Sequence, residues 1–275
     1  MSTVTRESRR EHRVTIQTLA QRKRKGRPFS MLTAYDCTFA RIFDQAGIDV
    51  LLVGDSLANV VQGLDTTLPV TVDEVVYHTR MVARGARRAL VVADMPFGSY
   101  QVGAEEAVRS AVALVKEGGA HAVKLEGGVT AREQIARIVA AQVPVMGHVG
   151  LTPQSVHAMG GFRVQGRTAT SRDRVLRDAR AVEEAGAFAV VLEGMPEALA
   201  AEITEMLRIP TIGIGAGPHC DGQVLVMHDM LGLNDSTPSF VKQYAGLGAL
   251  ASQAARAFSD DVENAKFPAD EHCYR

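Results

Sequence analysis

The stretch that decides the fold is Glu117-Gly-Gly-Ala-His-Ala-Val-Lys-Leu-Glu126, in which glycine, a short apolar run and an acid follow one another. Two other stretches repeat this pattern, Gln45-Ala-Gly-Ile-Asp-Val-Leu-Leu-Val-Gly-Asp55 and Glu184-Ala-Gly-Ala-Phe-Ala-Val-Val-Leu-Glu193. The glycine suits the left-handed residue that ends a helix, and the apolar run suits a strand buried on both faces. The repeat therefore predicts helix–strand units in series.

Eight short apolar runs, rich in Val, Ile and Leu, predict eight such strands along the chain. They cover Phe29–Thr33, Val50–Val53, Ala89–Ala93, Ala122–Leu125, Val143–Met146, Ala189–Leu192, Thr211–Ile214 and Val224–Met227. Helical patterns lie between them. Two capping-box patterns, Thr71-Val-Asp-Glu74 and Thr130-Ala-Arg-Glu133, mark expected helix starts.

Acids at the ends of the runs favour a closed barrel over an open sheet. Adjacent strands lie roughly 4.8 Å apart, so in an open sheet the acids after runs two, three, four and six would spread over some 15–20 Å. Closure gathers them around one mouth, where TIM barrels place catalytic groups. No Gly-x-Gly-x-x-Gly follows the first strand, which weakens the dinucleotide-fold alternative. We predict a (β/α)8 TIM barrel with an N-terminal helical extension.

The length and the absence of a linker favour one domain. The chain has 275 residues, of which 46% are hydrophobic, and we expect a single TIM-barrel domain over 1–275 with a basic helical extension over 1–27. Arginine and lysine are dense between Arg6 and Arg27, as in a nucleic-acid arm or a transit peptide. The favoured interpretation is a solvated helix around Val14–Lys25 with Ile16, Leu19 and Ala20 on its inner face.

Composition gives no sign of a nucleic-acid or membrane partner. The net charge is −1, no apolar stretch approaches the length of a transmembrane helix, and no secretory signal pattern is present. The three cysteines are few and far apart, which indicates a reducing compartment and argues against a disulfide framework or a zinc site. We expect a cytoplasmic protein.

Three acids follow consecutive predicted strands and suggest a metal site. Asp55, Asp94 and Glu126 would repel one another at one mouth unless a cation neutralised them, and oxygen ligands suit a hard ion such as Mg²⁺. The alternative is that each acid caps a helix or pairs with Lys124 or an arginine. We favour the metal site.

Three further side chains complete the candidate mouth. Lys124 lies two residues before Glu126, so both point to the same side of a strand, and its ammonium could hold a carboxylate or a carbonyl oxygen of the substrate. Glu193 ends the sixth run, across the barrel from the acids, and is placed as a general base. His148 ends the fifth run and is either a substrate contact or a structural histidine.

Several segments together resemble the ketopantoate hydroxymethyltransferase family. Gly-His-x-Gly-Leu-Thr-Pro-Gln and the glycine cluster with Asp-Gly-Gln are the most specific. The segments that carry the resemblance are Val53-Gly-Asp-Ser56, Thr67-Leu-Pro-Val-Thr71, Ala93-Asp-Met-Pro-Phe97, Val123-Lys-Leu-Glu-Gly-Gly128, Gly147-His-Val-Gly-Leu-Thr-Pro-Gln154, Gly160-Gly-Phe-Arg-Val-Gln-Gly166, Val191-Leu-Glu193, Ile212-Gly-Ile-Gly-Ala-Gly217 and Cys220-Asp-Gly-Gln223.

The resemblance implies a Mg²⁺-dependent enzyme of pantothenate biosynthesis that acts through a stabilised enolate. Such an enzyme moves a hydroxymethyl group from 5,10-methylenetetrahydrofolate to 3-methyl-2-oxobutanoate and gives 2-dehydropantoate. Matched by position, Asp55, Asp94 and Glu126 fall on metal-site acids and Glu193 falls on the proton acceptor. Ser56 and Lys124, with Asp55 and Asp94, fall on substrate contacts. Family members are usually decamers of two pentameric rings, so we expect a homo-oligomer.

Two rival functions stay open. One is a Mg²⁺-dependent carbon–carbon lyase or mutase of the phosphoenolpyruvate and isocitrate lyase type, although the cysteine-bearing loop of those lyases is not evident here. The other is a barrel that binds a ligand without catalysis. The long connection from Gly150 to about Ser171 is either a mobile lid or an ordered segment packed on a neighbouring subunit.

Overall fold

The computed structural model describes residues 13–234 and 236–274. The chain divides into two compact units, one up to Val224 and one from Leu225. The expectation of one domain over 1–275 therefore stays a prediction. Of the expected N-terminal extension, residues 1–12 lie outside the described part.

The first unit is a closed barrel of eight parallel strands in sequential order, β1 to β8. This confirms the predicted (β/α)8 architecture. The fifth strand begins two residues later than predicted, and the eighth begins two residues earlier. The strands are β1 (Phe29–Thr33), β2 (Val50–Val53), β3 (Leu90–Asp94), β4 (Ala122–Glu126), β5 (Val145–Gly150), β6 (Ala189–Glu193), β7 (Thr211–Ile214) and β8 (Gly222–Leu225).

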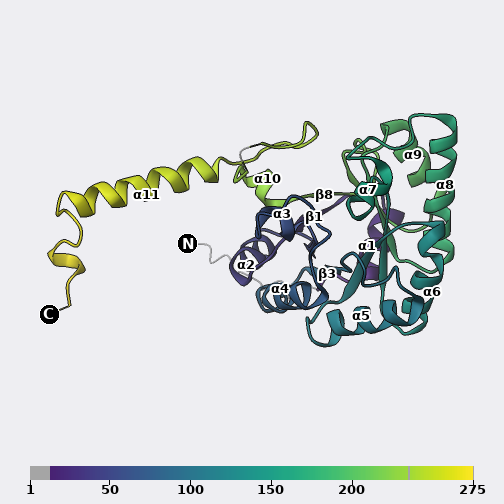
Figure 1. The fold of residues 1–275 in the computed structure, drawn as a ribbon, viewed down its shortest axis with the longest axis horizontal. Coiled ribbons are helices and arrows are strands. Elements are labelled where there is room, and N and C mark those ends of the chain that lie inside the picture. The colour runs from purple at the N-terminus through teal and green to yellow at the C-terminus, as the bar shows by residue number, and fades with distance from the viewer. Residues whose placement is uncertain (1–12, 235, 275) are drawn as a thin grey trace, which may run out of the picture. The chain divides into compact units, whose positions relative to one another are not determined.

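Helices surround the strands and fill the connections (Figure 1). The α-helices of this unit are α1 (Ile16–Arg24), α2 (Cys37–Gln45), α3 (Leu57–Val60), α4 (Val72–Gly85), α5 (Ala104–Lys116), α6 (Arg132–Ala140), α7 (Val156–Met159), α8 (Ala169–Glu184) and α9 (Glu197–Met206). Short 3₁₀ turns occur at η1 (Val129–Ala131) and η2 (Pro153–Ser155).

One of the two predicted capping boxes is confirmed. The Thr71 hydroxyl accepts from the Glu74 backbone N–H, and the Glu74 carboxylate accepts from the Thr71 N–H at 2.7 Å, so α4 begins as expected. The box at Thr130 is wrong, because Thr130 lies within η1. A side chain from another helix supplies the cap there: Asp178 Oδ1 accepts from the Val129 N–H at 2.9 Å.

The barrel interior is apolar over its lower part, at the N-terminal ends of the strands. The inward residues form one buried cluster, which holds Phe29, Met31, Val50, Leu52, Leu90, Val92, Ala122, Met146, Ala189, Val191, Ile212 and Val224. Alternate residues of a strand share a face. The next inward positions on β3, β4, β5 and β6 are therefore the polar residues at the other end.

The described part of the N-terminal extension closes the lower end. Val14 and Leu19 belong to the barrel cluster, and Ile16 packs against it. Basic residues of α1 pair with the barrel: Arg22 contacts Asp49 and Lys23 contacts Asp221, each at 2.8 Å. The predicted helix is confirmed, but these two basic side chains are anchors and not only a solvated face.

The second unit contains α10 (Met227–Leu231), α11 (Leu247–Glu263) and the turn η3 (Asp270–His272). The helix α11 has no buried residue, and its exposed apolar side chains include Leu250, Phe258 and Val262. Across both units, none of the helices in the described residues combines the length and the apolar character that crossing a membrane requires.

Candidate active site at the barrel mouth

The strand register gathers the predicted side chains at the C-terminal ends of β3 to β6. Asp94 lies beside Lys124, and Glu126 lies beside His148 in the next strand pair. Glu193 ends β6. Asp55 and Ser56 follow β2 and precede α3. All seven predicted site residues therefore lie at the same end of one barrel.

An ion pair forms the buried centre of the site. Lys124 Nζ lies 2.6 Å from Asp94 Oδ1, and both side chains are almost fully buried. Burial raises the pKa of Asp94 to about 7, although the Lys124 charge opposes this. Burial alone would lower the pKa of Lys124, but the carboxylates of Asp94 and Glu126 raise it above its ordinary value. Lys124 is therefore a charged donor, as the sequence predicts.

Glu126 is linked to His148, which in turn reaches Glu193. His148 Nδ1 lies 3.5 Å from Glu126 Oε1, and its Nε2 lies 3.2 Å from Glu193 Oε2. Burial raises the pKa of Glu126 well above its ordinary value, with Lys124 opposing. In an eight-stranded barrel β6 is opposite β2, so Glu193 is across the mouth from Asp55, yet only two strands from Glu126.

The position of His148 differs from the sequence interpretation and fixes its tautomer. It lies within β5, not after it, and burial lowers the pKa of its imidazole, so the ring is neutral near pH 7. Lys124 Nζ approaches Nδ1 at 3.3 Å. An ammonium can only donate, so Nδ1 accepts and Nε2 carries the proton, facing Glu193. Direct contact of His148 with a substrate stays a prediction.

Sequence reasoning missed an amide and a phenol that hold the acids. Gln154, on η2, donates from Nε2 to Asp55 Oδ2 at 2.9 Å, and its backbone N–H donates to Glu126 Oε2 at 3.0 Å. Tyr100 donates to Gln154 Oε1 at 2.8 Å. For Gln154 the signal was its place in the Gly-Leu-Thr-Pro-Gln motif. Neither side chain is ionised near neutral pH, so reasoning from charges missed both.

Ser56 lies at the edge of the site. Its hydroxyl is 2.9 Å from the Tyr35 hydroxyl, and burial raises the pKa of that phenol, so Tyr35 is neutral. The Tyr35 carbonyl accepts from the His78 ring at 2.7 Å. The connection that follows β1 thus holds Ser56 through the Tyr35 hydroxyl.

The oxygen donors at the mouth fit Mg²⁺ in one respect. The Asp55 N–H donates to Asp94 Oδ2 at 3.2 Å, so the two carboxylates are adjacent. Mg²⁺ in proteins usually takes one or two carboxylates and leaves the other positions to water and substrate. Asp94 Oδ1 is buried beside the Lys124 ammonium, 2.6 Å away, and accepts no other hydrogen bond from the described residues.

The full set of three acid ligands is not assembled in this geometry. Within residues 13–234 and 236–274, no group of three or more His, Cys, Asp or Glu side chains stands ready to hold a metal ion. Asp94 makes the lysine pair that the alternative interpretation foresaw, and Glu126 is held by Gln154. Direct ligation by Asp55, Asp94 and Glu126 together stays a prediction.

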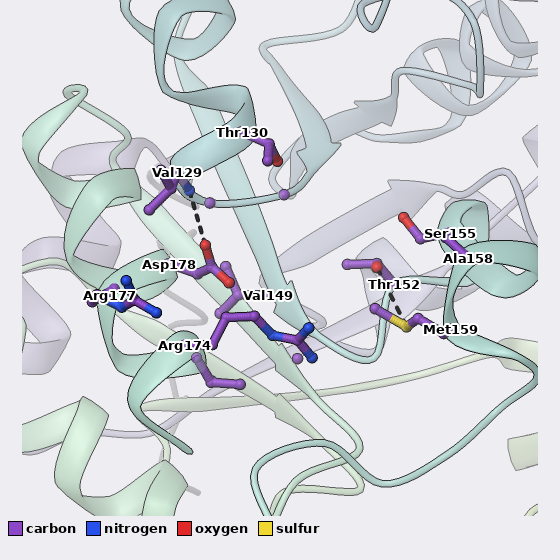
Figure 2. Close-up of a pocket in the computed structure, with 14 residues that line it drawn as sticks. Val129, Thr130, Val149, Thr152, Ser155, Ala158, Met159, Arg174, Arg177 and Asp178 are labelled. Carbon is purple, nitrogen blue, oxygen red and sulfur yellow. Dashed lines mark hydrogen bonds between the residues drawn. The ribbon is translucent and has the colours of Figure 1, made fainter. Parts of the chain in front are cut away.

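A cavity of about 490 Å³ lies beside the mouth, between the β4 and β5 connections and α8 (Figure 2). Arg174 and Arg177 come from α8, while Thr152 and Ser155 come from the turn that carries Gln154. The turn at residues 152–155 therefore separates the acid cluster from this cavity. Part of the long connection from Gly150 to about Ser171 therefore lines this cavity, and whether the connection moves as a lid stays a prediction.

Comparison with known sequences gives one consistent family. The profile of the ketopantoate hydroxymethyltransferase family matches residues 13–270. A relative from Leifsonia xyli subsp. xyli is 57% identical over 263 residues, which cover 95% of each chain. A relative from Clostridium botulinum is 53% identical over 262 residues, also 95% of each chain. Both carry the name 3-methyl-2-oxobutanoate hydroxymethyltransferase.

Solved structures show a shared fold at low sequence identity. A phosphonopyruvate hydrolase in complex with oxalate and Mg²⁺ has a TM-score of 0.61 at 15% identity and covers 94% of this chain and 91% of its own. A 2,3-dimethylmalate lyase, of the PEP mutase/isocitrate lyase superfamily, has a TM-score of 0.58 at 17% identity with the same coverage. These likenesses do not favour the lyase or mutase chemistry that the sequence left open.

The family assignment rests on sequence and agrees with the geometry. The profile spans most of the chain, and the curated relatives are more than half identical over nearly their whole lengths. The matched range includes all the charged residues at the barrel mouth. The chain belongs to the ketopantoate hydroxymethyltransferase family.

Proposed function

We propose that this chain transfers a hydroxymethyl group from 5,10-methylenetetrahydrofolate to 3-methyl-2-oxobutanoate, giving 2-dehydropantoate for pantothenate biosynthesis. The observation that carries the proposal is the family match together with the chain of contacts Asp94–Lys124–His148–Glu193 at one mouth. An α-keto acid needs a cation near its oxygens and a base near C3, and this chain of contacts supplies both.

Glu193 is the proposed base. It removes the C3 proton of the keto acid, and the electron pair left behind forms an enolate. C3 of the enolate bonds to the one-carbon unit, both C–N bonds to the folate break, and a water molecule supplies the hydroxyl oxygen. Tetrahydrofolate leaves, and its two nitrogens take up the C3 proton and one proton of the water. The neutral His148 ring lies beside the Glu193 carboxylate, with Nε2 3.2 Å from Oε2. Glu193 is less buried than His148, with 18% of its side chain exposed, so it is within reach of a bound substrate.

Lys124 and Ser56 are the proposed substrate contacts. The Lys124 ammonium lies among carboxylates, so it keeps its proton and can stabilise negative charge on the ketone oxygen. Ser56, held by Tyr35, can donate to the substrate carboxylate. Mg²⁺ held by Asp55 and Asp94, with Glu126 as a direct or water-mediated ligand, would polarise the ketone.

Isotope exchange tests the proposal without the folate. With protein and Mg²⁺ in D₂O, we expect the C3 proton signal of 3-methyl-2-oxobutanoate to disappear in proton NMR. Product formation with 5,10-methylenetetrahydrofolate is then measured separately. If the C3 proton does not exchange and no product forms, the proposed function is wrong, and a barrel that only binds a ligand becomes the better interpretation.

We also propose a cytoplasmic homo-oligomer, with a decamer as the specific expectation. The support from this chain is α11, which buries none of its residues within the chain and exposes Leu250, Phe258 and Val262. Exposed apolar side chains at helical spacing are typical of a surface that a partner covers. Light scattering should give ten chain masses; a monomer in dilute solution would contradict the proposal.

A further inference from the structure

Gln154 is the most highly connected uncharged side chain of the site, and its contacts assign it a specific task. It is 4% exposed and lies on η2, in the connection between β5 and α8. Its Nε2 donates to Asp55 Oδ2 and to the Met95 carbonyl at 2.9 and 3.0 Å. Both N–H groups of the amide are therefore used.

The surrounding groups allow the amide only one orientation. Tyr100 accepts from the Glu126 backbone N–H at 3.2 Å and donates to Gln154 Oε1 at 2.8 Å. A flipped amide would point Oε1 at the Asp55 carboxylate and at the Met95 carbonyl oxygen. Because both of these contacts are repulsive, the amide faces Asp55 with a donor.

The consequence for Asp55 is an asymmetric carboxylate. Oδ2 is held by the amide, while Oδ1 accepts no hydrogen bond from the residues that the structure describes. The backbone N–H of Gln154 donates to Glu126 Oε2. One residue thus fixes two acids that come from β2 and β4.

We infer that Gln154 is a positioning residue, which holds the Asp55 carboxylate so that Oδ1 is presented to a divalent cation. The inference rests on the proposed function only in assigning a cation to Asp55. Carboxylates that bind metals are usually hydrogen-bonded themselves, and loss of such a partner typically weakens metal affinity by about 10–100-fold. The turn at residues 152–155 also lines the neighbouring cavity, so Gln154 connects that wall to the acids.

The test compares Gln154→Met with Gln165→Met, in which the same change is made elsewhere in the connection. Gln165 bonds to Arg174 and to the Arg163 carbonyl and contacts none of the site acids. Mn²⁺ is the probe, and its dissociation constant is measured by electron paramagnetic resonance without substrates. We expect about 10–100-fold weaker Mn²⁺ binding in Gln154→Met and no change in Gln165→Met. Thermal unfolding of each variant shows that the folded state is retained.

A second variant and a second measurement keep the inference open to contradiction. Gln154→Asn keeps an amide but is one methylene too short to reach Asp55, so it too should weaken Mn²⁺ binding. It serves as the test variant in case Gln154→Met does not fold. Parent-like Mn²⁺ affinity in the folded variants would overturn the inference, as would a parent protein that binds no Mn²⁺. A crystal structure of either variant in which Asp55 keeps its place to within about 0.5 Å would overturn it too. Failure of the proposed function is read separately, by deuterium exchange in the parent protein.

Discussion

The two ends of the barrel interior are built on the same strands and yet have opposite chemistry. On β3 the inward residues are Leu90 and Val92 below and Asp94 above, and on β6 they are Ala189 and Val191 below and Glu193 above. A two-residue step along each strand therefore separates a packed apolar layer from a charged one. The lower end supplies stability, and the mouth places charges where burial strengthens their interactions.

The largest expected effect is at the mouth, from Glu193→Gln. The variant keeps the shape but cannot accept the C3 proton, so deuterium exchange should fall by about 10²–10⁴-fold with little change in thermal unfolding. Glu197→Gln is the matched control, because Glu197 is exposed and contacts His219. Equal losses of exchange in the two variants, or parent-like exchange in Glu193→Gln, would show that Glu193 is not the base.

Lys124→Met tests whether Asp94 is tolerated in the buried charged layer only because Lys124 pairs with it. It leaves Asp94 buried without its cation, which should lower the free energy of unfolding by about 3–5 kcal/mol at pH 8. The pKa of Asp94 is already about 7, so it can bind a proton as the pH falls, and the loss should shrink at pH 6. Denaturant unfolding without metal measures this. The double variant with Asp94→Asn should recover part of the loss; no recovery would mean that pairing is not the cause.

Leu19→Ala makes the opposite test at the lower end. Leu19 is fully buried in the barrel cluster, so its truncation should lower the free energy of unfolding by about 3 kcal/mol. The exchange rate per folded molecule should not change, since the mouth is untouched. Val112→Ala, at a side chain 39% exposed, is the control and should have a small effect. Reduced exchange in Leu19→Ala would show that the two ends are coupled.

The smallest expected effect is a pH dependence of stability at the lower end, from His121. Its Nδ1 accepts from the Val91 N–H at 2.9 Å, and its other nitrogen contacts Arg13. Burial and the Arg13 charge lower its pKa from 6.5 to about 4. The unfolded chain therefore binds more protons between these values, and the folded state loses stability as pH falls from 6.5 toward 4.

The size of that loss is about 1–2 kcal/mol once solvent screening around this half-buried ring is allowed for. Unfolding midpoints of the parent and of His121→Asn, measured from pH 7 to pH 4, separate the His121 contribution from the general acid sensitivity of the chain. The parent should lose more stability than the variant. Parallel pH profiles would show that His121 does not titrate differently on folding.

The sequence was sufficient for the barrel because each helix–strand unit repeats the same local signals. Glycine caps, apolar runs and terminal acids all indicate the same architecture, and this consistency makes the fold readable. The sequence was less informative where a residue far away along the chain determines how a helix begins. The Thr130 capping box was wrong because Asp178 of α8 supplies the cap, a contact 49 residues away in sequence.

The site could be predicted to the level of its ionisable residues. Asp94, Lys124, Glu126 and Glu193 were found because a charge at the end of a buried strand needs a reason. Gln154 was not found, because a glutamine in a long connection gives no such signal until its partners are known. The His148 tautomer was also out of reach, since it depends on which ring atom the Lys124 ammonium approaches.

The closure of the lower barrel by α1 has a consequence for traffic. Leu19 and the apolar layers of the described residues fill the interior below the charged layer. A ligand of Asp94, Lys124 or Glu193 therefore has to approach from the mouth, because the packed core closes the opposite side.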